Sequence, residues 1–145
     1  MTKRTPSFAR VLGDAPLHED EIDAVLEIGY AMANADGHVS IDELESFRAL
    51  AKHLRPAVKL DVLLDTLSAT FDRAESLEER VRIAGARLAR PAAREAAYKA
   101  AYTIAVFDLE TNEEERDMDE LLIEVLGLSA RVDDLEAEVN GALNG

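Results

Sequence analysis

Acidic side chains gather at two places in the chain that share one spacing. Asp36 and Glu43 lie seven residues apart, and Asp108 and Glu115 repeat this spacing 72 residues later. Carboxylate oxygens are the protein ligands that hard divalent cations prefer. If the two places meet in the folded chain, these four residues form a candidate metal site, for which Ca²⁺, Mg²⁺, Mn²⁺ and Zn²⁺ are all open choices.

The same four residues also have purely structural explanations. Glu43 and Glu115 each stand three residues after a serine or an asparagine, which is the pattern of a capping box at a helix start. Asp36 and Asp108 follow helices, where the dipole disfavours a negative charge by about 0.3–1 kcal/mol. An aspartate in that place can nevertheless order the turn by accepting backbone hydrogen bonds. Turn ordering alone and ligand binding on top of it therefore both remain open.

The elements that position these acids are two predicted helix hairpins. Ahead of Asp36, apolar residues from Ile22 to Ala33 recur at the three- and four-residue spacing of an amphipathic helix. Gly37 can end that helix in the left-handed conformation. Ser40 opens the next helix, so the acids lie at the elbow of the hairpin.

A second hairpin repeats the first with an offset of 72 residues, so that Tyr30 corresponds to Tyr102 and Leu50 to Leu122. Such a repeat indicates two related units packed together. The first helix of the second unit, 91–107, is rich in alanine, which allows close approach, so we expect it to be the central buried helix. No strand pattern occurs. The predicted fold is all-α, a compact bundle of six or seven helices built from two related hairpins.

The chain length and composition predict one self-sufficient domain. At 145 residues without cysteine, the chain can bury a core that needs no disulfide or structural metal. We expect residues 1–17 to form a partly helical extension, 18–139 a single helical domain, and 140–145 a frayed end. The longest uncharged runs, such as Ile28–Ala35, have eight residues, too few to span a membrane. We therefore expect no cleaved signal, no integral membrane segment and a cytoplasmic location.

The net charge of −14 argues against nucleic acid as a partner, because phosphate binding needs a cationic face. The charge is uneven, with a local +3 over residues 73–99 and −11 over residues 108–138. Such a bipolar chain suits a protein partner of opposite charge or head-to-tail homo-oligomers. The alternative is a set of solvated helix faces. Arg73, Arg80 and Arg87, spaced by seven, are expected on such a face.

The first elbow follows part of an EF-hand calcium loop but lacks its first ligand. Gly37 and Glu43 fall on the sixth and twelfth positions of that loop. Met32 stands at the first position, where the loop requires aspartate, and the helical spacing assigns Met32 to the core. A complete EF-hand is therefore not predicted.

The motif Ala-Asp-Gly-x-Val-Ser-x-x-Glu follows a helix, recurs in degenerate form and is closed by Leu-Gly-Leu-Ser. In these features residues 20–130 resemble the tellurite-resistance TerB-like family of all-helical proteins. The resemblance implies a helical domain whose acidic elbows meet as a metal- or ligand-binding centre, without established catalysis, in stress-response or membrane-associated complexes. It assigns that centre to Asp36, Glu43, Asp108 and Glu115. The second copy departs from the family at Leu109 and Thr111.

The function that these features predict is a non-enzymatic binding or scaffold domain with a protein partner, which can bring it to a membrane peripherally. No catalytic residues and no cofactor other than the divalent cation are predicted. Two alternatives remain open: a metal-dependent hydrolase that uses carboxylates, and a plain helical interaction module without a ligand. A hydrolase should place an apolar pocket beside the acids, whereas a scaffold should present them on an open face.

Overall fold

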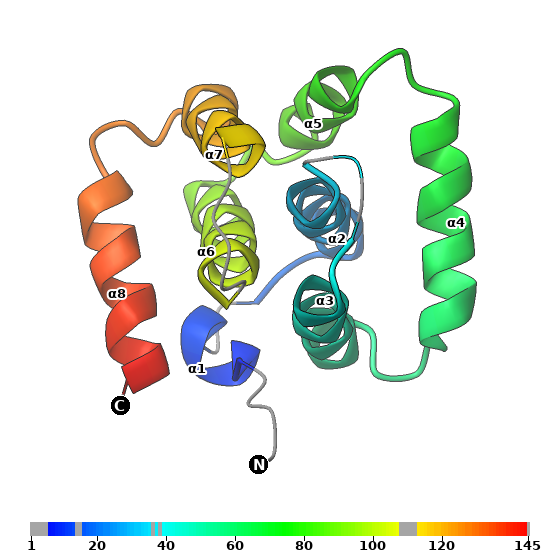
Figure 1. Ribbon diagram of the computed structural model, residues 1–145. Helices are drawn as coiled ribbons and strands as arrows, with labels where there is room; N and C mark the ends of the chain where they lie inside the picture. The colour runs from blue at the N-terminus through cyan, green and yellow to red at the C-terminus, as the bar shows by residue number, and fades with distance from the viewer. Residues whose placement is uncertain (1–5, 14–15, 36, 38, 108–112, 145) are drawn as a thin grey trace.

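The computed structural model consists of helices joined by short links (Figure 1). It describes residues 6–13, 16–35, 37, 39–107 and 113–144. Within these residues there are eight helices and no strand, which confirms the all-α class with one helix more than expected. The helices are α1 (Phe8–Leu12), α2 (Glu19–Ala33), α3 (Ile41–Leu54), α4 (Leu60–Asp72), α5 (Leu77–Ala86), α6 (Pro91–Phe107), α7 (Glu113–Leu126) and α8 (Val132–Asn144).

Local capping interactions set several helix ends. Ser76 Oγ accepts a hydrogen bond of 3.1 Å from the backbone N–H of Glu79 and so opens α5. Gly127, with φ of 66°, ends α7 in the left-handed conformation. The N–H of Leu128 then donates to the carbonyl of Ile123 at 3.0 Å. This is the Schellman arrangement expected of a glycine stop.

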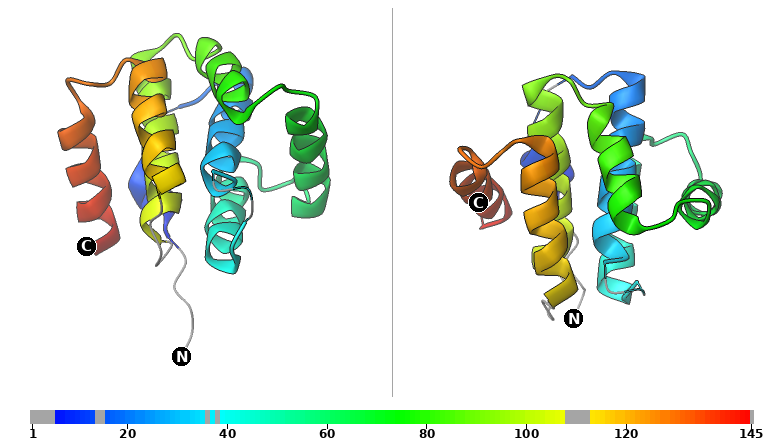
Figure 2. Two further views of the ribbon diagram at one scale, coloured as in Figure 1. Left: turned by 45° about the horizontal axis from the view of Figure 1, so that its top comes forward. Right: turned by 90° about the horizontal axis from the view of Figure 1, so that it is seen from above.

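The core is centred on the contact between α2 and α6, which lie side by side (Figure 2). Helix α6 also packs against α1, α3, α7 and α8, so it has neighbours on most sides. Eight of its residues are buried, although Val106 near its end stays exposed, which confirms the prediction that the alanine-rich helix is central. The buried alanines of α6 are Ala93, Ala96, Ala97, Ala100 and Ala101.

Two glycines allow helices to approach closely. A Cβ atom on Gly29 of α2 would lie 2.8 Å from a methyl of Leu50 on α3 and 3.3 Å from one of Ile104 on α6. A Cβ atom on Gly85 of α5 would lie 2.4 Å from Cγ1 of Val125 on α7. All three distances are shorter than ordinary van der Waals contact, so these helix pairs depend on the missing side chain.

The basic residues of α5 and the link after it pair with the acidic side of α2. Arg80 and Arg87 both bind the carboxylate of Glu27, which is 6% exposed. Arg90 binds Glu21 through its Nε at 2.9 Å. Two of the three arginines expected on a solvated face therefore form ion pairs within the domain. That expectation was wrong because the partner acids lie more than fifty residues away in the sequence.

The outer helices differ in how much of each is buried against the core. Helix α1 inserts Phe8 and Val11 into the core beside α6 and α8. Helix α8 continues to Asn144, past Asn140 where fraying was expected, because Leu143 still packs against the core. Helix α4 lies apart from the rest (Figure 1), and Leu67 is its one fully buried residue. None of the described helices combines the length and apolarity needed to cross a bilayer.

Replacing Gly85 with alanine should test the close contact between α5 and α7. An exposed glycine inside a helix normally costs roughly 0.5–1 kcal/mol relative to alanine. At Gly85 the added methyl meets Val125, and overpacking typically costs ~1–3 kcal/mol. We therefore expect Gly85→Ala to lower the free energy of unfolding in urea. Gly141→Ala in α8, where the added atom has nothing within 4 Å, should raise it. Equal gains in both variants would contradict the close contact.

Removing the side chain of Arg90 should shift acid unfolding. The hydrogen bond from Arg90, with that from the His18 backbone, lowers the pKa of Glu21 from 4.5 to about 2. The resulting stabilisation is present above pH 4.5 and is lost as the pH falls through 2. In Arg90→Met the pKa of Glu21 should rise, so the circular dichroism signal should be lost at a higher pH.

The control for this shift is Arg82→Met. Arg82 is half-exposed and pairs with Glu78 and Glu124 on the surface. Surface pairs contribute little to stability, so this variant should unfold close to the parent's pH. An equal shift in both variants would show that loss of any positive charge is the cause.

Candidate functional site

The helix ends that carry the predicted site lie on the same side of the domain. In the right-hand view of Figure 2, the C-terminal ends of α2 and α6 and the N-terminal ends of α3 and α7 all point toward the lower edge. Glu43 is the third residue of α3, and Glu115 is the third residue of α7. The two glutamates therefore occupy the same position in the first turns of α3 and α7.

Both glutamates are almost fully buried, with 1% of each residue exposed. Glu43 also forms the expected capping box, because its Oε1 accepts from the N–H of Ser40 at 2.9 Å. Ser40 Oγ accepts in return from the N–H of Glu43 at 3.1 Å. A capping role alone does not require burial, since the first turn of a surface helix is normally hydrated. Burial of both carboxylates is the feature that capping leaves unexplained.

Asp36 and Asp108 lie outside the described residues, as does Asn112, the expected cap of α7. The grouping of all four acids thus stays a prediction. Among the residues that the structure describes, no three His, Cys, Asp or Glu side chains are placed to hold a metal ion. A complete site would need Asp36 and Asp108 in addition to Glu43 and Glu115.

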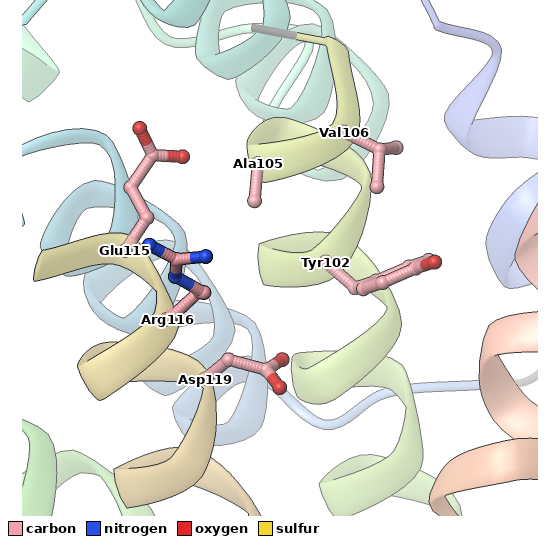
Figure 3. A pocket seen from close by; sticks show the side chains of 6 residues that line it. All are labelled: Tyr102, Ala105, Val106, Glu115, Arg116 and Asp119. Atoms are coloured by element: carbon pink, nitrogen blue, oxygen red, sulfur yellow. The ribbon is translucent and has the colours of Figure 1, made fainter. Parts of the chain in front are cut away.

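A pocket of about 140 Å³ opens between α6 and α7 next to Glu115 (Figure 3). Its walls are mainly apolar. The aromatic ring of Tyr102 lies on α6, and the carboxylate of Asp119 points from α7 toward α6. The lining residues are Tyr102, Ala105, Val106, Glu115, Arg116 and Asp119.

Behind this pocket, one buried hydroxyl contacts two carboxylates. Tyr98 Oη lies 2.8 Å from Asp119 Oδ1 on α7 and 2.8 Å from Glu136 Oε2 on α8. Burial, together with these two hydrogen bonds, raises the pKa of the Tyr98 hydroxyl. Burial also raises the pKa of Asp119 above 3.8, although the bond to Tyr98 opposes that change. The cluster therefore favours a protonated carboxyl beside the pocket.

Sequence reasoning missed Asp119, Tyr98 and Glu136. The spacing of four between Glu115 and Asp119 on a helix places both on one face, which is the one signal that could have drawn attention to Asp119. Nothing in the sequence pairs Tyr98 with acids 21 and 38 residues away. Chemically, a carboxyl with a raised pKa at a pocket wall can donate a proton or accept a cationic group.

Replacing Asp119 with asparagine should raise stability at neutral pH. A raised folded pKa means that the contribution of Asp119 is fully present below the unfolded pKa of 3.8 and is lost as the pH rises through the folded pKa. Asparagine can donate to Tyr98 without a titrating proton, so its contribution does not change with pH. Urea midpoints of parent and Asp119→Asn should therefore diverge from pH 4 to pH 8, with the variant higher.

Asp117→Asn, on the exposed side of the same helix, removes the same charge and should show no such divergence. A loss of stability in Asp119→Asn that is constant across this pH range would contradict a raised pKa at Asp119. It would instead indicate an ordinary ionised hydrogen-bond acceptor.

The chain was also compared with models of known protein families, with curated proteins and with solved structures, and none of the three comparisons gives a match. The function must therefore be argued from the helix ends, the pocket and the buried cluster.

Proposed function

We propose that this chain is a non-enzymatic, TerB-like helical binding domain that holds a divalent cation between its two hairpins. The observation that carries the proposal is the burial of Glu43 and Glu115 at equivalent positions of α3 and α7, on the same side of the domain. A buried carboxylate is costly unless compensated. A cation shared with Asp36 and Asp108 would add to the interactions that these glutamates already make, such as the hydrogen bond from Ser40 to Glu43. The helix ends with the bound cation would then present a surface to a protein partner.

Oxygen ligands favour a hard cation such as Ca²⁺, Mg²⁺ or Mn²⁺ over a thiophilic one. The ion would act structurally, by joining two hairpins whose negative charges otherwise repel each other. The resemblance to the TerB-like family adds a protein partner to this proposal, in stress-response or membrane-associated complexes.

One observation favours the hydrolase alternative. The pocket between α6 and α7 has apolar walls beside Glu115 and Asp119, which is the arrangement expected of a hydrolase. Glu115 lines that pocket and Glu43 is not among its described lining residues, so a cation held by Glu115 would lie beside a substrate bound there. A screen of ester and phosphate hydrolysis with Mn²⁺ separates the two functions, and turnover lost in Glu115→Gln would favour the hydrolase.

The binding proposal predicts a thermal response to divalent cations. A ligand at a hundred times its dissociation constant stabilises the folded state by about 2.7 kcal/mol, which is several degrees of melting temperature for a domain of this size. Melts of the chelated protein should rise by this amount with at least one of Ca²⁺, Mg²⁺, Mn²⁺ and Zn²⁺. Asp36→Asn with Asp108→Asn should abolish the response while leaving the metal-free protein as stable or slightly more stable.

Glu43→Gln with Glu115→Gln should have the same effect, because glutamine keeps the size and a capping oxygen. The matched control is Glu113→Gln with Glu114→Gln, which removes two exposed charges from the first turn of α7 and should leave the response intact. A parent that does not respond, with a double aspartate variant that loses much stability, would leave the aspartates as turn-ordering residues. The plain interaction module would then be the better description.

A further inference from the structure

The cluster around Tyr98 has fewer protons or positive charges than its contacts require. A phenol has one hydrogen to donate, yet Tyr98 Oη lies 2.8 Å from one oxygen of Asp119 and 2.8 Å from one of Glu136. If both carboxylates were ionised, one of these contacts would join two acceptors. Tyr98 is fully buried, so bulk water does not screen that contact. Either a carboxyl carries a proton, or a cation lies close by.

Two cations on or beside α6 and α8 are already engaged with other acids. Lys99 pairs with Glu138 at 3.1 Å, and Arg131 pairs with Glu95 at 3.1 Å and with Asp134 at 3.0 Å. Charged groups on the helices of the cluster include Glu95 and Lys99 on α6, Glu115, Arg116 and Glu120 on α7, Asp134 and Glu138 on α8, and Arg131 directly before α8. Of the acids, Glu136 and Glu120 act on Asp119 through their charge.

Arg116 lines the same pocket, but the ion pairs found among the described residues include none between Arg116 and Asp119. The pocket therefore gives access to a carboxylate that no described cation neutralises.

The walls of the pocket specify what kind of cation would fit. Tyr102 stacks on Tyr98, with ring centroids 6.0 Å apart, and presents an aromatic surface to the pocket. Ala105 and Val106 extend this apolar surface along α6. A divalent metal needs several oxygen ligands, whereas Glu115 and Asp119 are the two carboxylates among the described lining residues. A carboxylate at the wall disfavours an anion. An aromatic ring beside a carboxylate suits an ammonium group with a hydrocarbon body.

We propose that the pocket between α6 and α7 binds a small organic ammonium ion. The ammonium group donates a hydrogen bond to Asp119, and the hydrocarbon packs on Tyr102, Ala105 and Val106. Bound ammonium takes the place of the proton shared by Asp119, Tyr98 and Glu136, which is released to solvent. Glu115 lines this pocket and also belongs to the proposed divalent-cation site, but ammonium binding through Asp119 does not depend on a bound divalent cation.

The probe for this site is n-butylammonium, compared with the neutral 1-butanol and the anionic butyrate, which have similar bulk. In NMR titrations of the full chain, n-butylammonium should bind saturably and shift amides of α6 and α7. A hydrogen bond to a charged group predicts that 1-butanol binds about tenfold more weakly, and butyrate should not bind.

The probe keeps its charge up to about pH 10, as a lysine side chain does, so a change in affinity at lower pH reports on the protein. Because the proton and the ammonium ion compete, affinity should increase from pH 5 to pH 8. An affinity that is constant over this range would overturn the displacement of a proton.

Two variants test the assignment to these residues. Asp119→Asn keeps a hydrogen bond to Tyr98 and should bind n-butylammonium no better than 1-butanol. Ala105→Leu should fill the pocket and weaken both probes, which keeps the proposal testable if the first variant fails to fold. Asp117→Asn should bind as the parent does.

Equal binding of the charged and neutral probes by the parent, no saturable binding of either, or full binding by Asp119→Asn would overturn the proposal. The two proposed sites are separable, because Glu43→Gln should leave n-butylammonium binding unchanged. Asp119→Asn should likewise leave the thermal response to divalent cations unchanged.

Discussion

Close approach of α2 to α6 requires small side chains on both helices, and most of the domain is arranged around that contact. Helix α6 supplies buried alanines along its length, and α2 supplies Gly29 where α2, α3 and α6 meet. The separation of packed helices depends on the side chains between them. Because these are small, α2 and α6 can lie close together. Both helices end on the same side of the domain, and α3 and α7 begin there. That geometry puts the first turns of α3 and α7, with Glu43 and Glu115, on one side.

A second constraint is the electrostatic repulsion between acidic side chains. A chain with a net charge of −14 must keep acids on neighbouring helices from repelling one another. On one side of the domain, Arg80 and Arg87 neutralise Glu27, and Arg90 neutralises Glu21. The uneven charge of the sequence therefore serves contacts within the domain as well as any contact with a partner. Acids also gather in the buried cluster at Tyr98, where one hydroxyl lies between the carboxyl groups of Asp119 and Glu136.

The parts of the fold that sequence could predict are those that depend on neighbouring residues. Ser40 and Glu43 lie three residues apart and form the predicted box, and Gly127 ends α7 as predicted. The alanines of α6 and the core position of Met32 follow from helical spacing. These features need only local geometry and the 3.6-residue period.

Contacts between distant helices could not be predicted in the same way. The pairing of Glu27 with Arg80, and of Tyr98 with Asp119, depends on the angles at which helices cross, which side-chain spacing does not determine. The burial of Glu115 is of the same kind. A capping glutamate and a buried one have the same sequence pattern, so only the packing of the helices around them distinguishes the two.

The central claim is that one cation joins the two hairpins through Glu43 and Glu115. An anomalous difference map from crystals soaked in Mn²⁺ tests this directly, because the signal locates the metal independently of any effect on stability. We predict one strong peak at the shared helix ends, coordinated by carboxylate oxygens of both Glu43 and Glu115 together with Asp36 and Asp108. A map without a peak there, or with Mn²⁺ bound by only one hairpin, would contradict the claim.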